Sequence, residues 1–256
     1  MQDFSFPLVG TSAMTNKFYL ASPSAYSATS MKALIVCTNH TDYPTKPQKT
    51  GLWLSEATHF YDELQDRNIQ FDFVSPNGGP IPLDQRSMES RDTTNEKWMH
   101  NPVFQEKLAN SLRPNEVNPA DYQIIYYTGG HGTMWDFPDN TALQNITRHI
   151  YENGGMVAAV CHGVAGLLNV KLSDGSLFLK NKQVTGFSNI EEKIARLAEE
   201  VPFLLEDALK ERGAIYSKSL IPYVPHLEVD ERLITGQNPL SARKVGRKVV
   251  EEMFEK

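Results

Sequence analysis

The stretch GMVAAVCHGVAG, residues 155–166, joins an apolar run to a run of small residues with no loop between them. Residues 156–160 (MVAAV) have the composition of a strand buried on both faces, and residues 162–170 are expected to form a helix. Small residues on both sides let the chain turn sharply at Cys161. The sequence therefore predicts a strained corner between a strand and a helix, with Cys161 at its tip.

A cysteine at such a corner is a candidate nucleophile. The arrangement is that of a nucleophile elbow, with a thiol in place of the usual hydroxyl. The following helix is expected to direct free N–H groups and the positive end of its dipole at the sulfur, which favours the thiolate. The alternative is a small core cysteine at the end of a strand. Cys37 lies inside an ordinary strand pattern, and we expect it to be a core residue.

Short apolar runs alternate with helical periodicity along most of the chain. Strands are expected at 32–38, 69–75, 122–128, 156–160 and 232–235. Helices are expected at 51–67, 102–111, 140–152, 162–170, 191–199, 201–212 and from Pro239 onwards, with a hairpin at 177–187. This alternation predicts a mainly parallel sheet with helices on both faces. Ligands of such sheets bind at the carboxyl ends of the strands, here after Thr38, Thr128 and Val160.

The domain organisation follows from composition. Residues 1–30 are rich in Ser, Thr and Ala without a clear period, so we expect an N-terminal arm that packs on the surface. They lack the basic start and unbroken apolar run of a secretory signal. Residues 31–256 are expected to form a single α/β domain. Its polar stretch 77–118, with few aliphatic residues, is interpreted as a small cap inserted over a sheet edge.

Charge and cysteine content exclude several classes of protein. The 256 residues carry a formal net charge of −6, which argues against a nucleic acid or an anionic membrane surface as the main partner. No apolar run approaches the roughly 18 to 20 residues of a membrane span. Two cysteines cannot form a disulfide framework, so a reducing, cytoplasmic location is expected.

Two further segments contain candidate site residues. Gly129, Gly130 and His131 follow an apolar strand in YYTGGHGT, and such glycines let the backbone approach a ligand and present N–H groups to it. This segment is either an oxyanion hole or substrate cradle, or an ordinary glycine-rich turn. Glu56 lies in LWLSEATHF near the start of a helix. It is either a buried acid that shuttles protons or a solvated acid on the helix surface.

No metal site is predicted. Glu56, His59 and Glu63 have helical spacing, but the chain has neither an HExxH motif nor a clustered Cys/His set. It also lacks the phosphate-binding glycine motifs GxGxxG and GxxxxGK[ST].

Taken together, these segments resemble the ThiJ/PfpI (DJ-1-like) superfamily, and in particular its heat-shock-protein-31-type members. The resemblance covers about residues 32–250. It rests on the ordered stretches KTGLWLSEATHFYDEL, VNPADYQIIYYTGGHGTMWDFPDN, IYENGGMVAAVCHGVAGLLN, VTGFSNIEEKI and RLITGQNPLSA. The usual CHGPA of the family is CHGVA here, with Val164 in place of proline, which leaves the catalytic atoms in place.

The resemblance implies a flavodoxin-like doubly wound fold and a set of roles. Cys161 would be the nucleophile and His162 the adjacent base, oriented by Glu192 or by the neighbouring Glu191. Glu56 would face the sulfur, and the amides of Gly130 and His162 would be oxyanion donors. Which of Glu56 and His162 moves which proton stays open.

The activity implied by the resemblance is that of a glutathione-independent glyoxalase, a lyase that converts methylglyoxal to lactate. A thiolate adds readily to an aldehyde, and the conversion only redistributes oxidation level within one molecule, so neither a cofactor nor a metal is needed. The implied substrate is a small 2-oxoaldehyde and the implied assembly a homodimer. Members of this type are also described as chaperones and deglycases.

Alternative functions come from other classes. A glutamine amidotransferase-like hydrolase would use His226 and Glu228 late in the chain, although Ala159 stands where those enzymes have glycine. A peptidase is a similar alternative. A holdase chaperone would bind unfolded chains on an exposed apolar patch, and Cys161→Ala would then be harmless.

Overall fold

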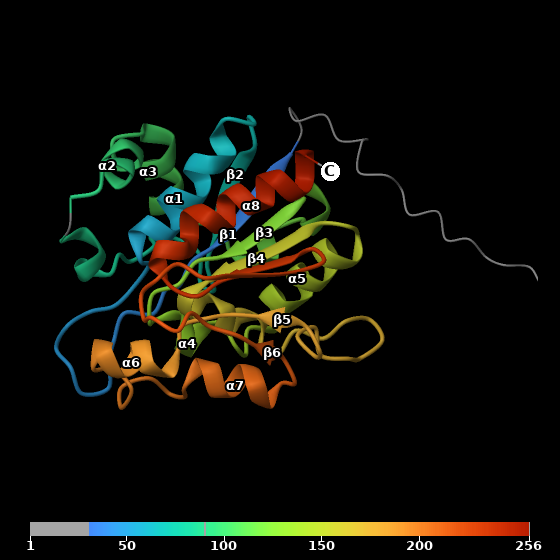
Figure 1. Cartoon of the computed structure of the whole chain (residues 1–256). Coiled ribbons are helices and arrows are strands. Elements are labelled where there is room, and N and C mark those ends of the chain that lie inside the picture. The colour runs from blue at the N-terminus through green and yellow to red at the C-terminus, as the bar shows by residue number, and fades with distance from the viewer. Residues whose placement is uncertain (1–30, 90, 256) are drawn as a thin grey trace, which may run out of the picture.

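The computed structural model describes residues 31–89 and 91–255, so the expected N-terminal arm lies outside the described residues. Its centre is a six-stranded sheet in the order β2-β1-β3-β4-β8-β7 (Figure 1). Five strands are parallel to their neighbours and β7 is antiparallel to β8. The bounds are β1 Lys32–Val36, β2 Gln70–Val74, β3 Ile124–Tyr127, β4 Met156–Val160, β7 Leu227–Asp230 and β8 Leu233–Gly236. The predicted α/β class and mainly parallel sheet are confirmed.

Helices cover both faces of this sheet (Figure 1). On one face α1 (Leu54–Gln65) packs along α8 (Ala242–Phe254), and α5 (Thr141–Glu152) lies on the other. The sequence of α5 explains its place. Asn140 caps the first turn by accepting a hydrogen bond from the Leu143 amide, and one stripe carries the buried Leu143, Ile146 and Ile150.

The predicted cap segment, 77–118, lies beside the edge strand β2. It contains α2 (Thr93–Met99) and α3 (Pro102–Ala109), whose first turns are capped by Asp92 and Asn101. Trp98 and Phe104 from these helices are buried in the same core as Phe71 and Phe73. The helix predicted at 102–111 is therefore present, whereas α2 was not predicted. The limits of this segment as an insertion stay a prediction.

Two sequence expectations were wrong, and one strand was not predicted. Residues 177–187 form no hairpin, because β5 (Gln183–Val184) satisfies its backbone groups by pairing in parallel with β6 (Ile215–Tyr216). The edge strand β7 was missed. The helix expected at 162–170 is a shorter 3₁₀ helix, η6 (Cys161–Leu167), because Gly163 and Gly166 pack tightly against β3 and its end.

The remaining elements lie around the carboxyl ends of the strands. They are η3 (Gln85–Met88), α4 (Thr133–Asp136), α6 (Asn189–Ala195), α7 (Leu205–Glu211) and η7 (Pro239–Ser241). Two short turns, η4 (Pro114–Glu116) and η5 (Pro119–Asp121), instead lie in the segment that leads into the amino end of β3. In the described part of the chain, no helix combines the length and apolar character that crossing a bilayer requires.

Candidate active site

Cys161 occupies the strained corner that the sequence predicts. It follows β4 directly and has φ of 57°, in the left-handed region that non-glycine residues rarely adopt. Residue 163 must be a glycine because β3 and its end pass close to it. A Cβ atom on Gly163 would lie 2.5 Å from the carbonyl oxygens of Tyr127 and Thr128. The corner is therefore held by the neighbouring strand, and the predicted strain is confirmed.

Residues predicted from two separate segments meet around one cavity. Cys161, His162, Gly130 and His131 all line it, and its volume is about 560 Å³. Gly130 has φ of 102°, and a Cβ atom there would collide with the carbonyl oxygen of Gly51, so only glycine fits. The cavity lies at the carboxyl ends of β3 and β4, where a parallel sheet is expected to bind its ligand.

His162 is placed between the thiol and a carboxylate. Its Nε2 lies 2.6 Å from Glu192 Oε2, and its Nδ1 lies 3.4 Å from Cys161 Sγ. Because the carboxylate can only accept, Nε2 carries the proton and Nδ1 is left free to accept one from the thiol. Glu191 points elsewhere, accepting hydrogen bonds from Ser188 and Asn238. Glu192 is thus the acid that contacts His162.

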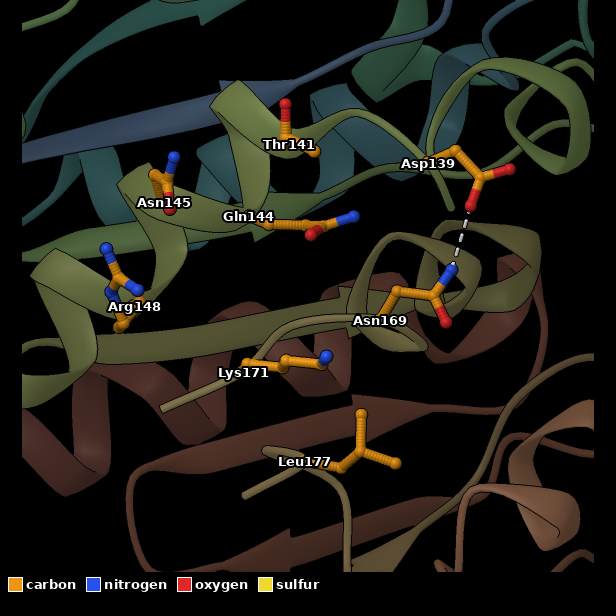
Figure 2. Close-up of a pocket in the computed structure, with 8 residues that line it drawn as sticks. All are labelled: Asp139, Thr141, Gln144, Asn145, Arg148, Asn169, Lys171 and Leu177. Atoms are coloured by element: carbon orange, nitrogen blue, oxygen red, sulfur yellow. Dashed lines mark hydrogen bonds between the residues drawn. The ribbon is translucent and has the colours of Figure 1, made fainter. Parts of the chain in front are cut away.

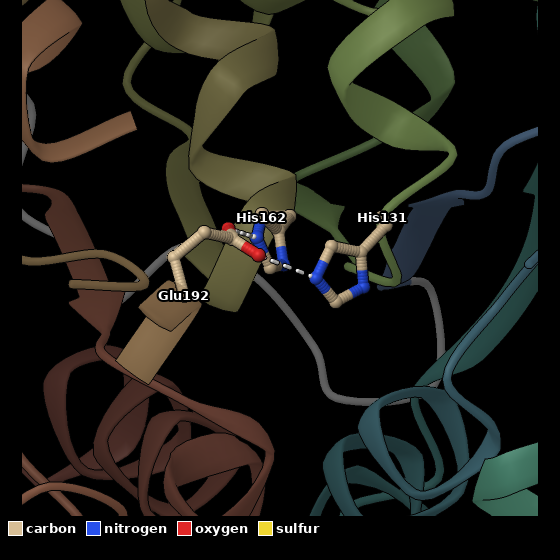
Figure 3. A group of neighbouring side chains, drawn as sticks. All are labelled: His131, His162 and Glu192. Atoms are coloured by element: carbon tan, nitrogen blue, oxygen red, sulfur yellow. Dashed lines mark hydrogen bonds and ion pairs between the residues drawn. The ribbon is translucent and has the colours of Figure 1, made fainter. Parts of the chain in front are cut away.

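Glu192 also binds a second imidazole, that of His131 (Figure 3). His131 Nε2 lies 2.9 Å from Glu192 Oε1, and its Nδ1 faces Arg86 Nη2 at 3.4 Å. Burial and the neighbouring His162 lower the pKa of His131 to about 4, so the ring is neutral. Burial alone would raise the pKa of Glu192, but the two imidazoles hold it well below its usual range. The carboxyl group is therefore ionised.

Glu56 is fully buried beside the sulfur, so its alternative reading as a solvated acid is wrong. Its Oε2 accepts a hydrogen bond of 2.5 Å from the Gly129 amide. Its Oε1 has no hydrogen-bond partner in the described part of the chain. Burial raises the pKa of Glu56 to about 8. The carboxyl group is consequently mostly protonated at neutral pH.

The expectation that the corner favours a thiolate was wrong. Burial raises the pKa of Cys161 well above its usual range, and an ionised Glu56 would raise it further. The amide of His162 acts in the opposite direction but does not outweigh burial. The seven-residue η6 is too short to contribute a large dipole. Cys161 therefore needs a base to lose its proton.

Cys37 is a core residue, as predicted. Cys37 follows the last residue of β1 and its side chain is fully buried, which raises the pKa of its thiol to about 12. Thr128 Oγ1 donates a hydrogen bond of 3.5 Å to its sulfur. Cys37 does not line the cavity.

The candidate metal ligands of α1 are separated in space. Glu56 lies beside the thiol, His59 binds Asp92, and Glu63 binds Arg243 and Arg247. The one set of three side chains in the described chain that could hold an ion is His131, His162 and Glu192, whose ligand atoms lie within 4.8 Å of one another. Their nitrogen and oxygen atoms already bind each other, and Arg86 faces the remaining nitrogen of His131.

Several residues of the cavity wall had no signal in the sequence. Arg86 lies in a polar segment of η3, and its guanidinium binds the buried Asp84. Tyr223 and Phe187 come from loops without a periodic pattern. His226, by contrast, contacts Ser217 and Glu228 and does not line the cavity.

A second groove lies away from Cys161, over α5 and the chain that follows η6 (Figure 2). Its lining is polar and contains no cysteine or histidine: Asp139, Thr141, Gln144, Asn145, Arg148, Asn169, Lys171 and Leu177. It therefore holds no histidine that could activate a hydroxyl or amine of its lining, and the cavity at Cys161 is the candidate active site.

Fold and site together define an α/β protein that presents a cysteine, a histidine and two carboxyl groups at the carboxyl edge of a parallel sheet. The family model described as DJ-1/PfpI matches residues 50–252. The chain belongs to the DJ-1/PfpI family.

Individual relatives agree with this assignment. The chain is 34% identical over 235 residues to the glutathione-independent glyoxalase HSP31 of Saccharomyces cerevisiae, covering 87% of this chain and 98% of that protein. The crystal structure of glyoxalase III from Candida albicans superposes with a TM-score of 0.81 at 28% identity, covering 88% and 98% of the two chains. The Francisella tularensis Rapid Encystment Protein 24 KDa has a TM-score of 0.84 at 42% identity, covering 88% and 99%.

Proposed function

We propose that this protein is a glutathione-independent glyoxalase, a lyase that converts methylglyoxal and similar small 2-oxoaldehydes to 2-hydroxy acids through a covalent bond to Cys161. The observation that carries the proposal is the free Nδ1 of His162, 3.4 Å from Cys161 Sγ, with Nε2 fixed on Glu192. The names of the yeast and Candida albicans relatives support the same activity.

In the proposed first step, the sulfur of Cys161 bonds to the aldehyde carbon, C1. The thiol proton passes to Nδ1 of His162 and from there to the former aldehyde oxygen, which gives a hemithioacetal. Ionised Glu192 stabilises the imidazolium that forms in between. Because Cys161 is neutral at rest, the nucleophile is generated only when His162 accepts the proton.

In the second step, Glu56 in its ionised form removes the proton from C1 and returns it to the neighbouring carbon, C2. His162 meanwhile takes the proton from the oxygen of C1 on its free Nδ1 and passes it to the oxygen of C2. The resulting 2-hydroxy thioester is hydrolysed by water, which releases the acid and restores the thiol. This division assigns the carbon-bound protons to Glu56 and the oxygen-bound protons to His162. A pKa of about 8 gives Glu56 the basicity that the first of these tasks requires.

The enediol that forms between these protonations needs hydrogen-bond donors. The amide of His162 already points at the sulfur, and the amide of Gly130 has no hydrogen-bond partner within the described residues. We assign both amides to the enediol oxygens. Gly129 leaves the His162 amide accessible, since a Cβ atom on Gly129 would lie 3.0 Å from the His162 backbone nitrogen.

The proposal includes a homodimer in the cytoplasm. Both cysteines are free and buried, which suits a reducing compartment. The exposed Leu220 and Ile221 give a second copy, or an unfolded chain in a chaperone role, an apolar surface to cover. Light scattering behind size exclusion tests the dimer directly.

The activity is tested by incubating the protein with methylglyoxal in the absence of glutathione and resolving D- from L-lactate. The wild type should form lactate, and Cys161→Ser should not, while retaining the fold because the change is nearly isosteric. Cys37→Ser is the matched control and should keep wild-type turnover. Lactate formation by Cys161→Ser at the wild-type rate would refute the proposal.

A further inference from the structure

The cavity at Cys161 is much larger than methylglyoxal requires. Methylglyoxal has only five non-hydrogen atoms, which fill roughly 150 Å³ if each is counted at the roughly 30 Å³ of a liquid water molecule. The cavity volume is about 560 Å³, in the range of sites that enclose larger ligands. Space for a longer chain therefore lies beyond the 2-oxoaldehyde group.

The residues that line this space are of two kinds. One wall is polar and comes from α1, η3 and α2, with Ser55, His59, Arg86 and Asn95. The lining residues from the later part of the chain are mostly apolar: Phe187, Ala195, Tyr223, Pro239 and Leu240. A ligand that fits this lining carries both hydrogen-bonding groups and C–H groups.

The polar wall presents groups that nothing in the described chain satisfies. Asn95 is only 7% exposed, and its Oδ1 accepts from Thr58, but its Nδ2 has no partner. The hydroxyl of Ser55 likewise has none among the described residues. Asp92 occupies Nε2 of His59 and leaves Nδ1 free. Ser55 and His59 are half-buried, and all three side chains line the cavity. Their groups without a protein partner can therefore hydrogen-bond a ligand, which points to a ligand with hydroxyl groups.

The charges of this wall argue against an anionic ligand. Arg86 is its permanent cation, and it is already bound to Asp84 at 2.5 Å. Asp92 adds a second carboxylate, and the ionised Glu192 lies close behind His131. A phosphate or carboxylate on the ligand would meet more negative than positive charge. The wall therefore suits a neutral, polyhydroxylated chain.

We propose that the cavity accepts 2-oxoaldehydes that carry a neutral polyhydroxylated chain, as formed from hexoses, with the oxoaldehyde at Cys161 and the hydroxyl groups on Ser55, His59 and Asn95. This inference rests on the proposed function and names the substrate class of the same site. The reaction is R–CO–CHO plus water giving R–CHOH–COOH. The thiol bonds to C1, the proton of C1 moves to C2, and water breaks the thioester, so no external oxidant or reductant is needed.

The test compares kcat/KM for two six-carbon substrates, 3-deoxyglucosone and 2-oxohexanal, which differ in their hydroxyl groups. The wild type should prefer 3-deoxyglucosone by about tenfold or more. Ser55→Ala should lower this preference by about fivefold, as expected for one lost hydrogen bond. Asn95→Ala should do the same, provided that its melting temperature shows a folded protein. Asn145→Ala, in the groove of Figure 2, is the matched control and should leave the preference unchanged.

Three results would overturn the inference: no preference for 3-deoxyglucosone, equal losses on both substrates in Ser55→Ala, or a faster reaction with the 6-phosphate of 3-deoxyglucosone. Methylglyoxal serves as the reference substrate. If it is converted while the preference is absent, only the inference fails. If neither methylglyoxal nor the longer substrates are converted, the proposed function fails as well.

Discussion

Replacing Glu56 by Gln should change stability and turnover in opposite directions. Glu56 has an ordinary pKa of 4.5 and a pKa of about 8 in the folded protein. A raised folded-state pKa means that its favourable contribution is complete below pH 4.5 and is lost as the pH rises through about 8. At roughly 1.36 kcal/mol per pH unit, burying this group costs on the order of 3 kcal/mol at pH 7. Gln does not ionise, so the variant avoids this cost.

The predicted result is a rise in Tm of roughly 5 °C or more at pH 7 and a smaller rise near pH 5, where less of the cost is present. The Gln carbonyl can still accept from the Gly129 amide, which keeps the site in place. Turnover of methylglyoxal should fall by about 100-fold or more, because an amide cannot carry a proton between carbons. Calorimetry at pH 5, 7 and 8.5 with steady-state rates checks both parts. A lower Tm at every pH, or turnover within a few-fold of wild type, would refute the role of Glu56.

The other predictions concern the neighbours of Glu56. Glu192→Gln should lower kcat by about 10³-fold. A Gln amide donates to Nε2 of His162, so the ring proton moves to Nδ1, which then cannot accept the thiol proton. A wild-type kcat would remove Glu192 from the mechanism. Iodoacetamide should label Cys161 before Cys37, faster as the pH rises, since only Cys161 lines the cavity and its pKa is raised; peptide mapping that found Cys37 labelled first would contradict this. Gly130→Ala should unfold several degrees below wild type, because its Cβ collides with the Gly51 carbonyl at a positive φ; an unchanged Tm would show that the loop relaxes freely.

Local sequence patterns were sufficient for much of the fold. The parallel strands are short apolar runs buried on both faces, and the stripe and cap of α5 are visible in residues 140–152. The corner at Cys161 was also predictable, because small residues on either side of a strand end leave few other conformations. Each of these features depends on neighbours within one or two turns of chain.

Features that depend on distant contacts were not predictable. Glu56 lies on the stripe of α1 that faces the sheet, which left a buried acid as one of two alternatives. The contact that decides between them is with the Gly129 amide, 73 residues later, and the pattern of α1 does not indicate it. Glu191 and Glu192 are adjacent acids, and only the helix rotation of about 100° per residue turns one toward Asn238 and the other toward His162. The high pKa of Cys161 likewise results from burial by the whole fold rather than from η6 alone.

The most direct test of the account is to trap the covalent intermediate. The protein is mixed with methylglyoxal, quenched in acid within one turnover, and digested for mass spectrometry. If Cys161 forms the covalent bond, the peptide containing it gains the mass of one methylglyoxal, and hydroxylamine releases this adduct as lactohydroxamate. Full turnover with no adduct on Cys161, or with the adduct on Cys37 alone, would contradict it.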